Sequence, residues 1–390
     1  MIVTPAGAIA PGAVIGIFGG GQLGRMTALA AARLGYRAHV FCQDVDEPAA
    51  QVAAAHTYAA FDDVAALDAF ADACAVVTLE WENAPTAALD RIAARTPVRP
   101  GAAALRVAQH RGREKRFAAA CGAETVAWRP VDGPAALADA LAALDAPSIL
   151  KSTRLGYDGK GQVRLKPGDD VDAAWRALWA DGAPPPDVDE PAILEAMTPF
   201  ACEISVIVAR SLHGAIAAFP AAENDHSGGI LRASACPALV APAVAAEAER
   251  LARVMAERLE VVGLLAVEMF VIDRNGGRDR AQSLIVNEIA PRPHNSGHWT
   301  MDGCRTDQFE QAVRAVCGLP LGAVDRTADV VMTNLLGDET EQWPVHLAAP
   351  DAKLHLYGKA ARQPGRKMGH VNRVTPLRAP PGPTLGGLDV

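Results

Sequence analysis

Hydrophobic and polar positions near the start of the chain follow a strand, helix, strand order. Residues 14–19 form an apolar run typical of a strand, residues 22–34 carry alanine and leucine at helical spacing before Gly35, and residues 36–42 form a second apolar run. A later apolar run, AVVTLE, ends at Glu80. Sheets of this kind bind ligands beyond the carboxyl ends of their strands. The pattern therefore predicts an N-terminal α/β unit with the segment EWENAP at its ligand-binding edge.

Beyond Pro100 the apolar runs are shorter and alternate with turns. Strands are predicted for PSILKS, GQVRLK, AILEAM, CEISVIVAR, GAIAAFP, LLAVEMFVID and SLIVNEIA, and a helix is predicted for residues 244–260. GYDGKGQ is predicted as a turn, DGAPPPDVDEP as a surface loop and RNGGRDRA as the connection between the last two strands. From about residue 330 the periodicity weakens, and RAPPGPTLGG is predicted to be a mobile tail. A chain of 390 residues exceeds what one core organises, which predicts two or three domains.

Composition narrows the class of protein. Half of the residues are hydrophobic, 21% are charged and the net charge is −8, which argues against broad binding to nucleic acid or anionic membranes. The seven cysteines are scattered and include no C-x-x-C pair, so reduced thiols are expected rather than disulfides or a zinc site. No basic segment precedes an apolar run at the start, and no apolar stretch reaches about 18 residues, which predicts a cytoplasmic protein.

A glycine turn, IGIFGGGQLGRM, follows the first predicted strand. Gly19, Gly21 and Gly24 give the spacing G-x-G-x-x-G, and Asp44 lies twenty residues after the last glycine. This is the sequence fingerprint of a nicotinamide dinucleotide site. The same strand, turn and helix serve many phosphate-bearing ligands, because N–H groups at a helix N-terminus attract any anion. The turn alone leaves both interpretations open.

Two glutamates on the last predicted strands suggest a metal site. If the connection between these strands turns about Arg278, then Glu268 and Glu288 face each other across an antiparallel pair. The repulsion between them is removed if a divalent cation bridges them, and carboxylates together with nucleotide phosphates are usual magnesium ligands. Asn287 can add a neutral oxygen. The alternative is a solvated hairpin face in another register.

A lysine and a glycine-rich loop predict a phosphate site. The segment KSTRLGYDGKGQ, residues 151–162, places Lys151 at a strand end before Gly156, Gly159 and Gly161. One ammonium and several backbone N–H groups can surround a polyphosphate, although the spacing is not that of a P-loop. A tight turn without a ligand is the other interpretation.

Two more polar segments follow. NEIAPRPHNSGHW brings Arg292, His294 and His298 directly after the predicted metal strand, where a proline-stiffened loop suits an anionic reactant. A structural role in hydrogen bonding is favoured for His298 more than for His294. Near the end of the chain LYGKAARQPGRKMGH concentrates positive charge in an acidic protein. This segment is either a solvated basic face or the local charge that a monophosphate substrate requires.

From Ile15 to His370 these segments together resemble the ATP-grasp enzymes and, within them, the family of 5-(carboxyamino)imidazole ribonucleotide synthases (PurK). The resemblance is carried by GGGQLGRM, EWEN, GYDGKGQ, EISVIVAR, AENDHSGGILR, VEMFV and, most specifically, NEIAPRPHNSGHWT. It implies an α/β (α+β) ATP-grasp fold with an N-terminal Rossmann-like domain over residues 1–108. It also implies an ATP-grasp domain over residues 109–330, with a lid at about 122–197, and a small β-rich C-terminal domain and tail over residues 331–390.

The resemblance implies the reaction as well. ATP phosphorylates bicarbonate to carboxyphosphate, and the amine of 5-aminoimidazole ribonucleotide is then carboxylated, with release of ADP and phosphate, in purine biosynthesis. The implied cofactors are ATP and magnesium or manganese, and relatives are commonly homodimers. Neither a nucleic acid nor a membrane is expected as a partner.

The site residues implied by the resemblance fall into three groups. Those expected at the nucleotide are Arg111, Lys151, Gly156, Tyr157, Asp158, Gly159, Lys160, Gly161, Gln162, Glu195, Ala196, Met197, Thr198, Glu203, His226, Asn287 and Glu288. Glu268 and Glu288 would bind the metal, and the residues expected to be catalytic are Arg292, His294, Lys160 and Tyr157. Those expected at the ribonucleotide are Gln22, Glu80, Asp158, Lys359 and Arg366. Most relatives have an aliphatic residue at the position of Thr198.

Four other functions are consistent with parts of the sequence. A nicotinamide oxidoreductase explains only the first 45 residues and leaves the paired glutamates without a role. A nucleotide-binding protein without catalysis has less need of two magnesium ligands. Biotin carboxylase and formate-dependent glycinamide ribonucleotide transformylase are the nearest alternatives inside the superfamily, and the segment RPHNSGHW points away from both by resemblance.

Overall fold

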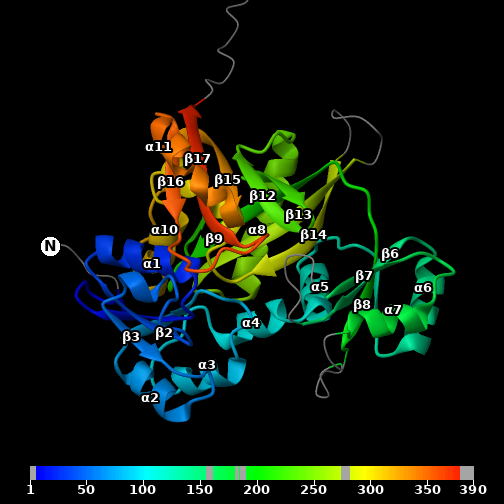
Figure 1. Ribbon diagram of the computed structural model, residues 1–390, viewed down its shortest axis with the longest axis horizontal. Helices are drawn as coiled ribbons and strands as arrows, with labels where there is room; N and C mark the ends of the chain where they lie inside the picture. The colour runs from blue at the N-terminus through cyan, green and yellow to red at the C-terminus, as the bar shows by residue number, and fades with distance from the viewer. Residues whose placement is uncertain (1–5, 155–160, 181–183, 185–189, 274–281, 378–390) are drawn as a thin grey trace, which may run out of the picture.

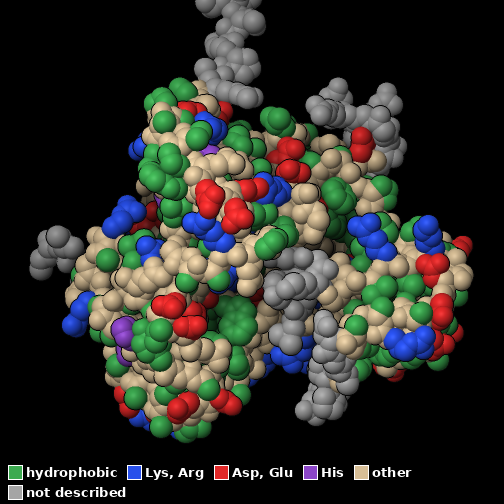
Figure 2. Space-filling view, in the orientation of Figure 1, with side chains coloured by type: hydrophobic (Ala, Val, Ile, Leu, Met, Phe, Trp, Pro, Cys, Tyr) green, Lys and Arg blue, Asp and Glu red, His purple; other side chains and the backbone are tan. Residues whose placement is uncertain are grey.

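The computed structural model describes residues 6–154, 161–180, 184, 190–273 and 282–377. These residues form three sheets, which Figure 1 shows as an N-terminal domain in blue, a central sheet, and a separate lobe that carries β5 to β8. On the face drawn in Figure 2 acidic and basic side chains are interspersed. Within the described ranges, no helix is both long and apolar enough to cross a membrane.

The N-terminal domain is a parallel four-stranded sheet in the order β3-β2-β1-β4. Its strands are β1 (Val14–Phe18), β2 (Arg37–Cys42), β3 (Ala55–Tyr58) and β4 (Val76–Leu79), and its helices are α1 (Gln22–Arg33), η1 (Ala50–Val52), α2 (Val64–Asp72) and α3 (Thr86–Ala93). The predicted strand, helix, strand order is confirmed. Helix α1 starts directly after Gly21 and ends before Gly35, whose φ of 81° suits a residue without a side chain.

Two helices lead from this domain into the smaller lobe. They are α4 (Ala102–Ala108) and α5 (Arg111–Ala120). The lobe is an antiparallel sheet in the order β5-β8-β6-β7, made of β5 (Trp128–Val131), β6 (Ser148–Ser152), β7 (Gln162–Leu165) and β8 (Ala192–Ala196), with α6 (Pro134–Leu144) and α7 (Val171–Leu178) packed on it. In Figure 1 this lobe projects away from the other two sheets.

The central sheet has nine strands in the order β14-β13-β9-β11-β12-β15-β17-β16, and β10 pairs with β9. The strands are β9 (Cys202–Arg210), β10 (Ile216–Ala218), β11 (Ala222–Ser227), β12 (Ile230–Cys236), β13 (Gly263–Asp273), β14 (Gln282–Ala290), β15 (Ala328–Leu336), β16 (Ala352–Leu356) and β17 (Lys367–Pro376). The predicted helix over 244–260 is α8 (Pro242–Arg258), which buries Leu251 and Met255 against β9, β13 and β14. This packing keeps β13 and β14 in a fixed register.

Buried polar residues prevented the last strands of the chain from being predicted from the sequence. Asn334 on β15 and His370 and Asn372 on β17 are fully buried, so these strands lack the alternation of apolar and polar positions from which a strand is predicted. The β-rich character expected after residue 330 is confirmed, and the individual strands that the sequence did not predict there are β15, β16 and β17, which extend the central sheet. The predicted tail lies outside the described residues.

Helix α10 joins the N-terminal domain to the central sheet. The helices and short turns in this part of the chain are η2 (Asn295–Gly297), α9 (Thr300–Gly303), α10 (Gln308–Val316), η3 (Gly337–Gln342) and α11 (Trp343–Ala348). Phe309 and Val313 of α10 pack with Leu23 and Met26 of α1, and α10 also lies against β9 and β13. The glycine turn before α1 is thereby fixed relative to the central sheet.

Candidate active site

A cavity of about 660 Å³ is lined by residues from all three sheets. Strand ends of the N-terminal domain, the start of α5, β6 of the lobe and strands β9, β13 and β14 each contribute to its wall. Twelve of the residues expected at the site line it: Gln22, Glu80, Arg111, Lys151, Gln162, Glu203, His226, Glu268, Asn287, Glu288, Arg292 and His294. The fold thus brings together segments that are far apart in the sequence.

The predicted pairing of two glutamates across β13 and β14 is confirmed. Glu268 lies opposite Glu288, and the register shifts by one residue at this point, so that Met269 lies opposite Val286. Asn287 is the extra residue of this bulge, and bulges often redirect side chains near active sites. Asn287 and Glu288 both line the cavity as a result. The connection about Arg278 lies outside the described residues.

Glu268 has the environment of a carboxylate that lacks a cation. Its side chain is nearly buried, and Oε1 has no hydrogen-bond partner. Burial and then the charge of Glu288 raise the pKa of Glu268 to about 8. Ligand atoms of Glu268, Glu288 and His294 all lie within 4.8 Å of one another. A hard divalent cation fits this donor set, because it would satisfy the unpaired oxygen and remove the repulsion.

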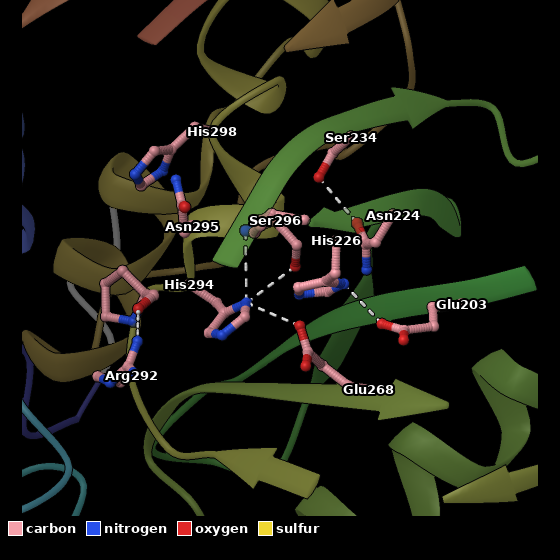
Figure 3. Close-up of polar contacts among 12 residues, drawn as sticks. Glu203, Asn224, His226, Ser234, Glu268, Arg292, His294, Asn295, Ser296 and His298 are labelled. Carbon is pink, nitrogen blue, oxygen red and sulfur yellow. Dashed lines mark hydrogen bonds and ion pairs between the residues drawn. The ribbon is translucent and has the colours of Figure 1, made fainter. Parts of the chain in front are cut away.

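The loop after β14 presents a neutral histidine. His294 Nδ1 lies 2.9 Å from Ser296 Oγ and 3.6 Å from Glu268 Oε1, and Figure 3 shows the imidazole aimed at that carboxylate. Gln308 of α10 fixes the backbone, since its side chain accepts a hydrogen bond from His294 N and donates one to His294 O, each at 2.9 Å. Burial and then the charges of Arg292 and Lys367 lower the pKa of His294 well below its usual value.

His298, in the same loop, has the structural role favoured for it. Its side chain is fully buried, and Nδ1 lies 2.9 Å from Nε2 of Gln308. The ring packs against Phe309, Tyr357 and His370. Gln308 therefore forms hydrogen bonds with both His294 and His298. The loop packs against α10 and the C-terminal strands.

Arg292 forms an ion pair that crosses from the central sheet to the N-terminal domain. Its Nε donates to a carboxylate oxygen of Glu82, and its Nη1 donates to Pro293 O at 2.9 Å. Burial opposes the charge of Arg292, but the charge and hydrogen bond of Glu82, with the charges of Glu80 and Glu288, together outweigh burial and raise the pKa of the guanidinium. Glu82 had not been singled out in the sequence, although it lies in the predicted EWEN segment.

His226 on β11 is paired with Glu203 on β9. His226 Nδ1 is 2.6 Å from Glu203 Oε2, and Figure 3 shows the two side chains meeting beside Glu268. Burial opposes the charged imidazole, but the hydrogen bond to Glu203 and the charge of Glu268 raise the pKa of His226 overall. Both residues line the cavity.

Lys151 is held by a buried carboxylate. Glu195 Oε2 lies 2.5 Å from Lys151 Nζ, and Glu195 Oε1 lies 2.9 Å from Lys115 Nζ. The expected contribution of Glu195 to the adenine pocket can therefore come only from its backbone in this arrangement. Lys115, on α5, is a residue that the sequence interpretation missed, because nothing in the spacing marks it as the partner of an acid 80 positions later.

The glycines of the turn leave room for the carboxylate of Glu80. Gly21 N donates to Glu80 Oε1 at 2.9 Å and Gly24 N lies 3.4 Å from Glu80 Oε2. A Cβ at Gly19 or Gly21 would lie 2.6 Å from atoms of Glu80, so a side chain at either position would displace it. The N–H groups that would bind a dinucleotide phosphate are thus occupied, and Asp44 is exposed. The G-x-G-x-x-G spacing needs no dinucleotide to account for it.

Several expected residues lie elsewhere or outside the described residues. Gly156, Tyr157, Asp158, Gly159 and Lys160 are outside them, and Gly161 directly follows. The residues that are described but do not line the cavity are Gly161, Glu195, Ala196, Met197, Thr198, Lys359 and Arg366. Lys359 Nζ donates to Lys367 O at 2.7 Å, and Arg366 Nη1 donates to Ala361 O at 2.9 Å. Lys367, which does line the cavity, was noted only as part of the basic run.

Glu114, on α5, is an additional buried acid next to the carboxylate pair. It is 3% exposed, and its Oε1 accepts a hydrogen bond from Ile289 N at 2.6 Å. Burial and then the charge of Glu288 raise the pKa of Glu114 to about 8. The protonated carboxyl therefore persists in the folded protein at a pH where an unfolded glutamate is ionised.

Replacing Glu114 by glutamine is expected to make the stability of the protein less sensitive to rising pH. The folded-state pKa exceeds that of an unfolded glutamate, about 4.3, so the stability from the protonated form is complete below that value. It is lost as pH rises through about 8. Glutamine accepts the same hydrogen bond without titrating. Melting temperatures between about pH 6 and 9 in metal-free buffer should fall more steeply for the wild type, and parallel curves would contradict the assignment.

Comparisons with known proteins agree with this geometry. Family models match the chain as a "Ribonucleotide synthetase preATP-grasp domain" over residues 13–109, an "ATP-grasp domain" over residues 116–309 and a "Phosphoribosylaminoimidazole carboxylase C-terminal domain" over residues 330–379. The N5-carboxyaminoimidazole ribonucleotide synthase of Brucella melitensis is 47% identical over 94% of this chain and 97% of the relative. That of Bacillus subtilis is 42% identical over 93% of this chain and 92% of the relative.

Solved structures are similar over almost the whole chain. An ADP complex of an N5-carboxyaminoimidazole ribonucleotide synthetase has a TM-score of 0.88 and 42% identity, covering 95% of this chain and 94% of that one. The Aspergillus clavatus synthase in complex with ADP and 5-aminoimidazole ribonucleotide has a TM-score of 0.83 and 32% identity, covering 94% of each chain.

Proposed function

The chain belongs to the family of N5-carboxyaminoimidazole ribonucleotide synthases within the ATP-grasp enzymes, and on that premise we propose how its cavity carries out the reaction. The protein is an ATP-dependent ligase that carboxylates 5-aminoimidazole ribonucleotide in purine biosynthesis. The observation that carries the proposal is the facing pair of Glu268 and Glu288, with Arg292 and His294 in the same cavity. We infer from it a cation site beside an anion site.

The proposed chemistry has two steps. An oxygen of bicarbonate attacks the γ-phosphorus of ATP, ADP leaves, and carboxyphosphate forms. The amine of the ribonucleotide then attacks the carboxyl carbon, and phosphate leaves. Arg292, whose raised pKa keeps it charged, would orient the bicarbonate and carboxyphosphate oxygens. His294 is neutral because its pKa is lowered, so it can accept or donate a hydrogen bond at the reacting carboxylate.

Glu268 and Glu288 would hold magnesium or manganese at the nucleotide phosphates. The fit rests on the unpaired Oε1 of Glu268 and on the short separation of the ligand atoms. When bound, the cation would neutralise charge on the β- and γ-phosphate oxygens. Arg111 and Lys151 would contact the same phosphates; both line the cavity, and Arg111 Nη1 lies 3.8 Å from Glu288 Oε2.

The remaining roles in nucleotide binding follow the family resemblance. Residues 156–162 would close over the phosphates and exclude water from the fragile intermediate. Residues 195–198 would bracket the adenine, and Glu203 with His226 would bind the ribose. Tyr157, Asp158 and Lys160 would face the aminoimidazole.

The ribonucleotide would bind between the glycine turn and the C-terminal strands. Gln22 and Glu80 line the cavity at that end, and Glu80 would accept hydrogen bonds from ribose hydroxyls. Lys359 and Arg366 were expected at the phosphate but do not line the cavity, so we add Lys367, which does. Lys359 would then act by fixing the backbone of Lys367, to whose carbonyl it donates.

ADP formation from magnesium ATP and bicarbonate tests the proposed function. The measurement is made with and without 5-aminoimidazole ribonucleotide. Strong stimulation by the ribonucleotide is the expected result. Cleavage of ATP at the same rate without it would show that the acceptor is wrong, and glycinamide ribonucleotide with formate would be the next pair to test.

We also propose a cytoplasmic homodimer with small-molecule substrates. None of the seven cysteines, all of which lie in the described residues, forms a disulfide, which supports a reducing compartment. The dimer rests on the family resemblance and is tested by light scattering, in which a particle of about twice the 40.7 kDa chain is expected. A particle of the mass of one chain would overturn it.

A further inference from the structure

The segment EWEN, directly after β4, contains two carboxylates, Glu80 and Glu82, and each forms a hydrogen bond to another part of the chain. Glu80 accepts hydrogen bonds from the N–H groups of the glycine turn, and Glu82 accepts one from Arg292 of the loop after β14. The two glutamates are separated by one residue. The same short segment therefore touches the proposed ribonucleotide end of the cavity and the proposed carboxyphosphate end.

The backbone of this segment is fixed independently of the two carboxylates. Gln109, next to the start of α5, donates from Nε2 to Glu82 O and to Ala84 O, each at 2.8 Å. Trp81, between the two glutamates, packs against Phe61 with ring centroids 5.5 Å apart. These contacts hold the backbone of the segment on the Glu82 side.

Glu82 determines how the Arg292 guanidinium is placed. Nε of Arg292 donates to Glu82, and Nη1 donates to Pro293 O, so two of the three nitrogens are directed and the plane of the group is fixed. The guanidinium lines the cavity together with His294 and Glu288. A planar donor gains specificity for a planar carboxylate only when its orientation is fixed.

We propose that Glu82 is a positioning residue that holds Arg292 in place for carboxyphosphate and couples that residue to the ribonucleotide site through Glu80. This inference rests on the proposed function. It adds to that function an energetic coupling between the ribonucleotide site in the N-terminal domain and Arg292 in the central domain. A ribonucleotide that binds Glu80 restricts the EWEN segment, and the restricted segment holds Arg292 where the intermediate forms. Coupling of this kind is reciprocal, so ligands at either end should bind more tightly when the other end is occupied.

Glu82→Gln, Glu82→Asp and the control Asp68→Asn test this role. Asp68 forms an exposed ion pair with Arg91 in the same domain, with contacts of 2.7 and 2.6 Å, so its change removes a similar pair far from the cavity. For each variant kcat, the KM for bicarbonate and the KM for the ribonucleotide are measured from ADP formation. Binding of ADP is measured separately by calorimetry, because a loss confined to the Arg292 site should leave it unchanged.

Glu82→Gln is expected to lower the ribonucleotide-stimulated kcat by about 10²-fold, the usual effect of a displaced catalytic group. It should also raise the KM for bicarbonate and weaken the stimulation by the ribonucleotide. ADP affinity should stay the same, and Glu82→Asp should restore part of kcat because it keeps the charge. Asp68→Asn should behave as wild type.

Two results would overturn the proposal. One is a Glu82→Gln enzyme with wild-type kcat and bicarbonate KM; the other is an equal loss in the glutamine and aspartate variants that follows their melting temperatures. If the glutamine variant does not fold, Glu82→Asp carries the test, and an unchanged bicarbonate KM in it counts against the proposal. A wild type without ribonucleotide-dependent ADP formation would overturn the proposed function itself, which is a different result.

Discussion

Glu288→Gln is expected to lower the ribonucleotide-dependent formation of ADP by about 10²- to 10³-fold, equivalent to about 3–4 kcal/mol of transition-state stabilisation. Glu288 faces Glu268 across β13 and β14, and the two carboxylates would share the cation that neutralises the transferring phosphoryl group. The amide of glutamine keeps the size of the side chain but not its charge. The loss should therefore fall on kcat and on the magnesium dependence.

The magnesium titration separates a metal ligand from a residue that merely shapes the cavity. The concentration of magnesium that gives half-maximal activity should rise strongly in Glu288→Gln. Glu257→Gln, an exposed change on α8, serves as the control and should leave both quantities unchanged. A Glu288→Gln enzyme with reduced kcat and wild-type magnesium dependence would contradict the assignment of Glu288 to the metal.

The same variant should be at least as stable as the wild type without metal. Burial and then the charge of Glu288 raise the pKa of Glu268, because the folded protein holds the two carboxylates close together. Removing one charge removes that repulsion. Opposite effects on activity and on melting temperature would distinguish a site residue from a general structural one.

Local patterns were sufficient to predict the parts of the fold that follow from period and spacing. The β1, α1, β2 order was evident from apolar spacing, and the facing of Glu268 and Glu288 followed from counting positions about a connection. The bulge at Asn287 did not follow, because a bulge is set by packing of both strands rather than by the residues at the turn.

The contacts that could not be predicted join residues whose partners lie far away in the chain. Glu80 occupies the glycine turn from 59 positions away, and Glu82 reaches Arg292 from 210 positions away. No periodicity specifies such pairs. Similarly, a run of basic residues does not reveal which of them faces inward, and the structure places Lys367 at the cavity instead of Lys359 and Arg366.

The buried triad at the lobe is the place where a single charge should matter most for stability. Lys115 on α5 is 2% exposed, Lys151 is close to buried, and Glu195 lies between them with contacts of 2.9 and 2.5 Å. Burial opposes the charge on Glu195, but the two lysines outweigh it and lower its pKa to about 2. Neutralising Glu195 would leave two buried ammonium groups facing each other without a counterion.

Glu195→Gln is therefore expected to lower the free energy of unfolding by about 3–5 kcal/mol, the cost of breaking a buried ion pair. The control is Glu190→Gln, which removes the partner of Arg116, the residue next to Lys115 on α5. The Arg116 side chain is 50% exposed, so that loss should stay below about 1 kcal/mol. Urea unfolding of both variants at neutral pH gives the comparison.

The pH dependence provides a second test that a packing defect would not imitate. Because the pKa of Glu195 is depressed in the folded protein, its contribution is present above the unfolded value of about 4.3 and is lost as pH falls toward about 2. The difference in stability between wild type and Glu195→Gln should therefore shrink as pH falls from about 4.3 toward about 2. A difference that stays constant across this range, or one equal to that of Glu190→Gln, would mean that Glu195 is not the counterion that stabilises Lys115 and Lys151 in the folded protein.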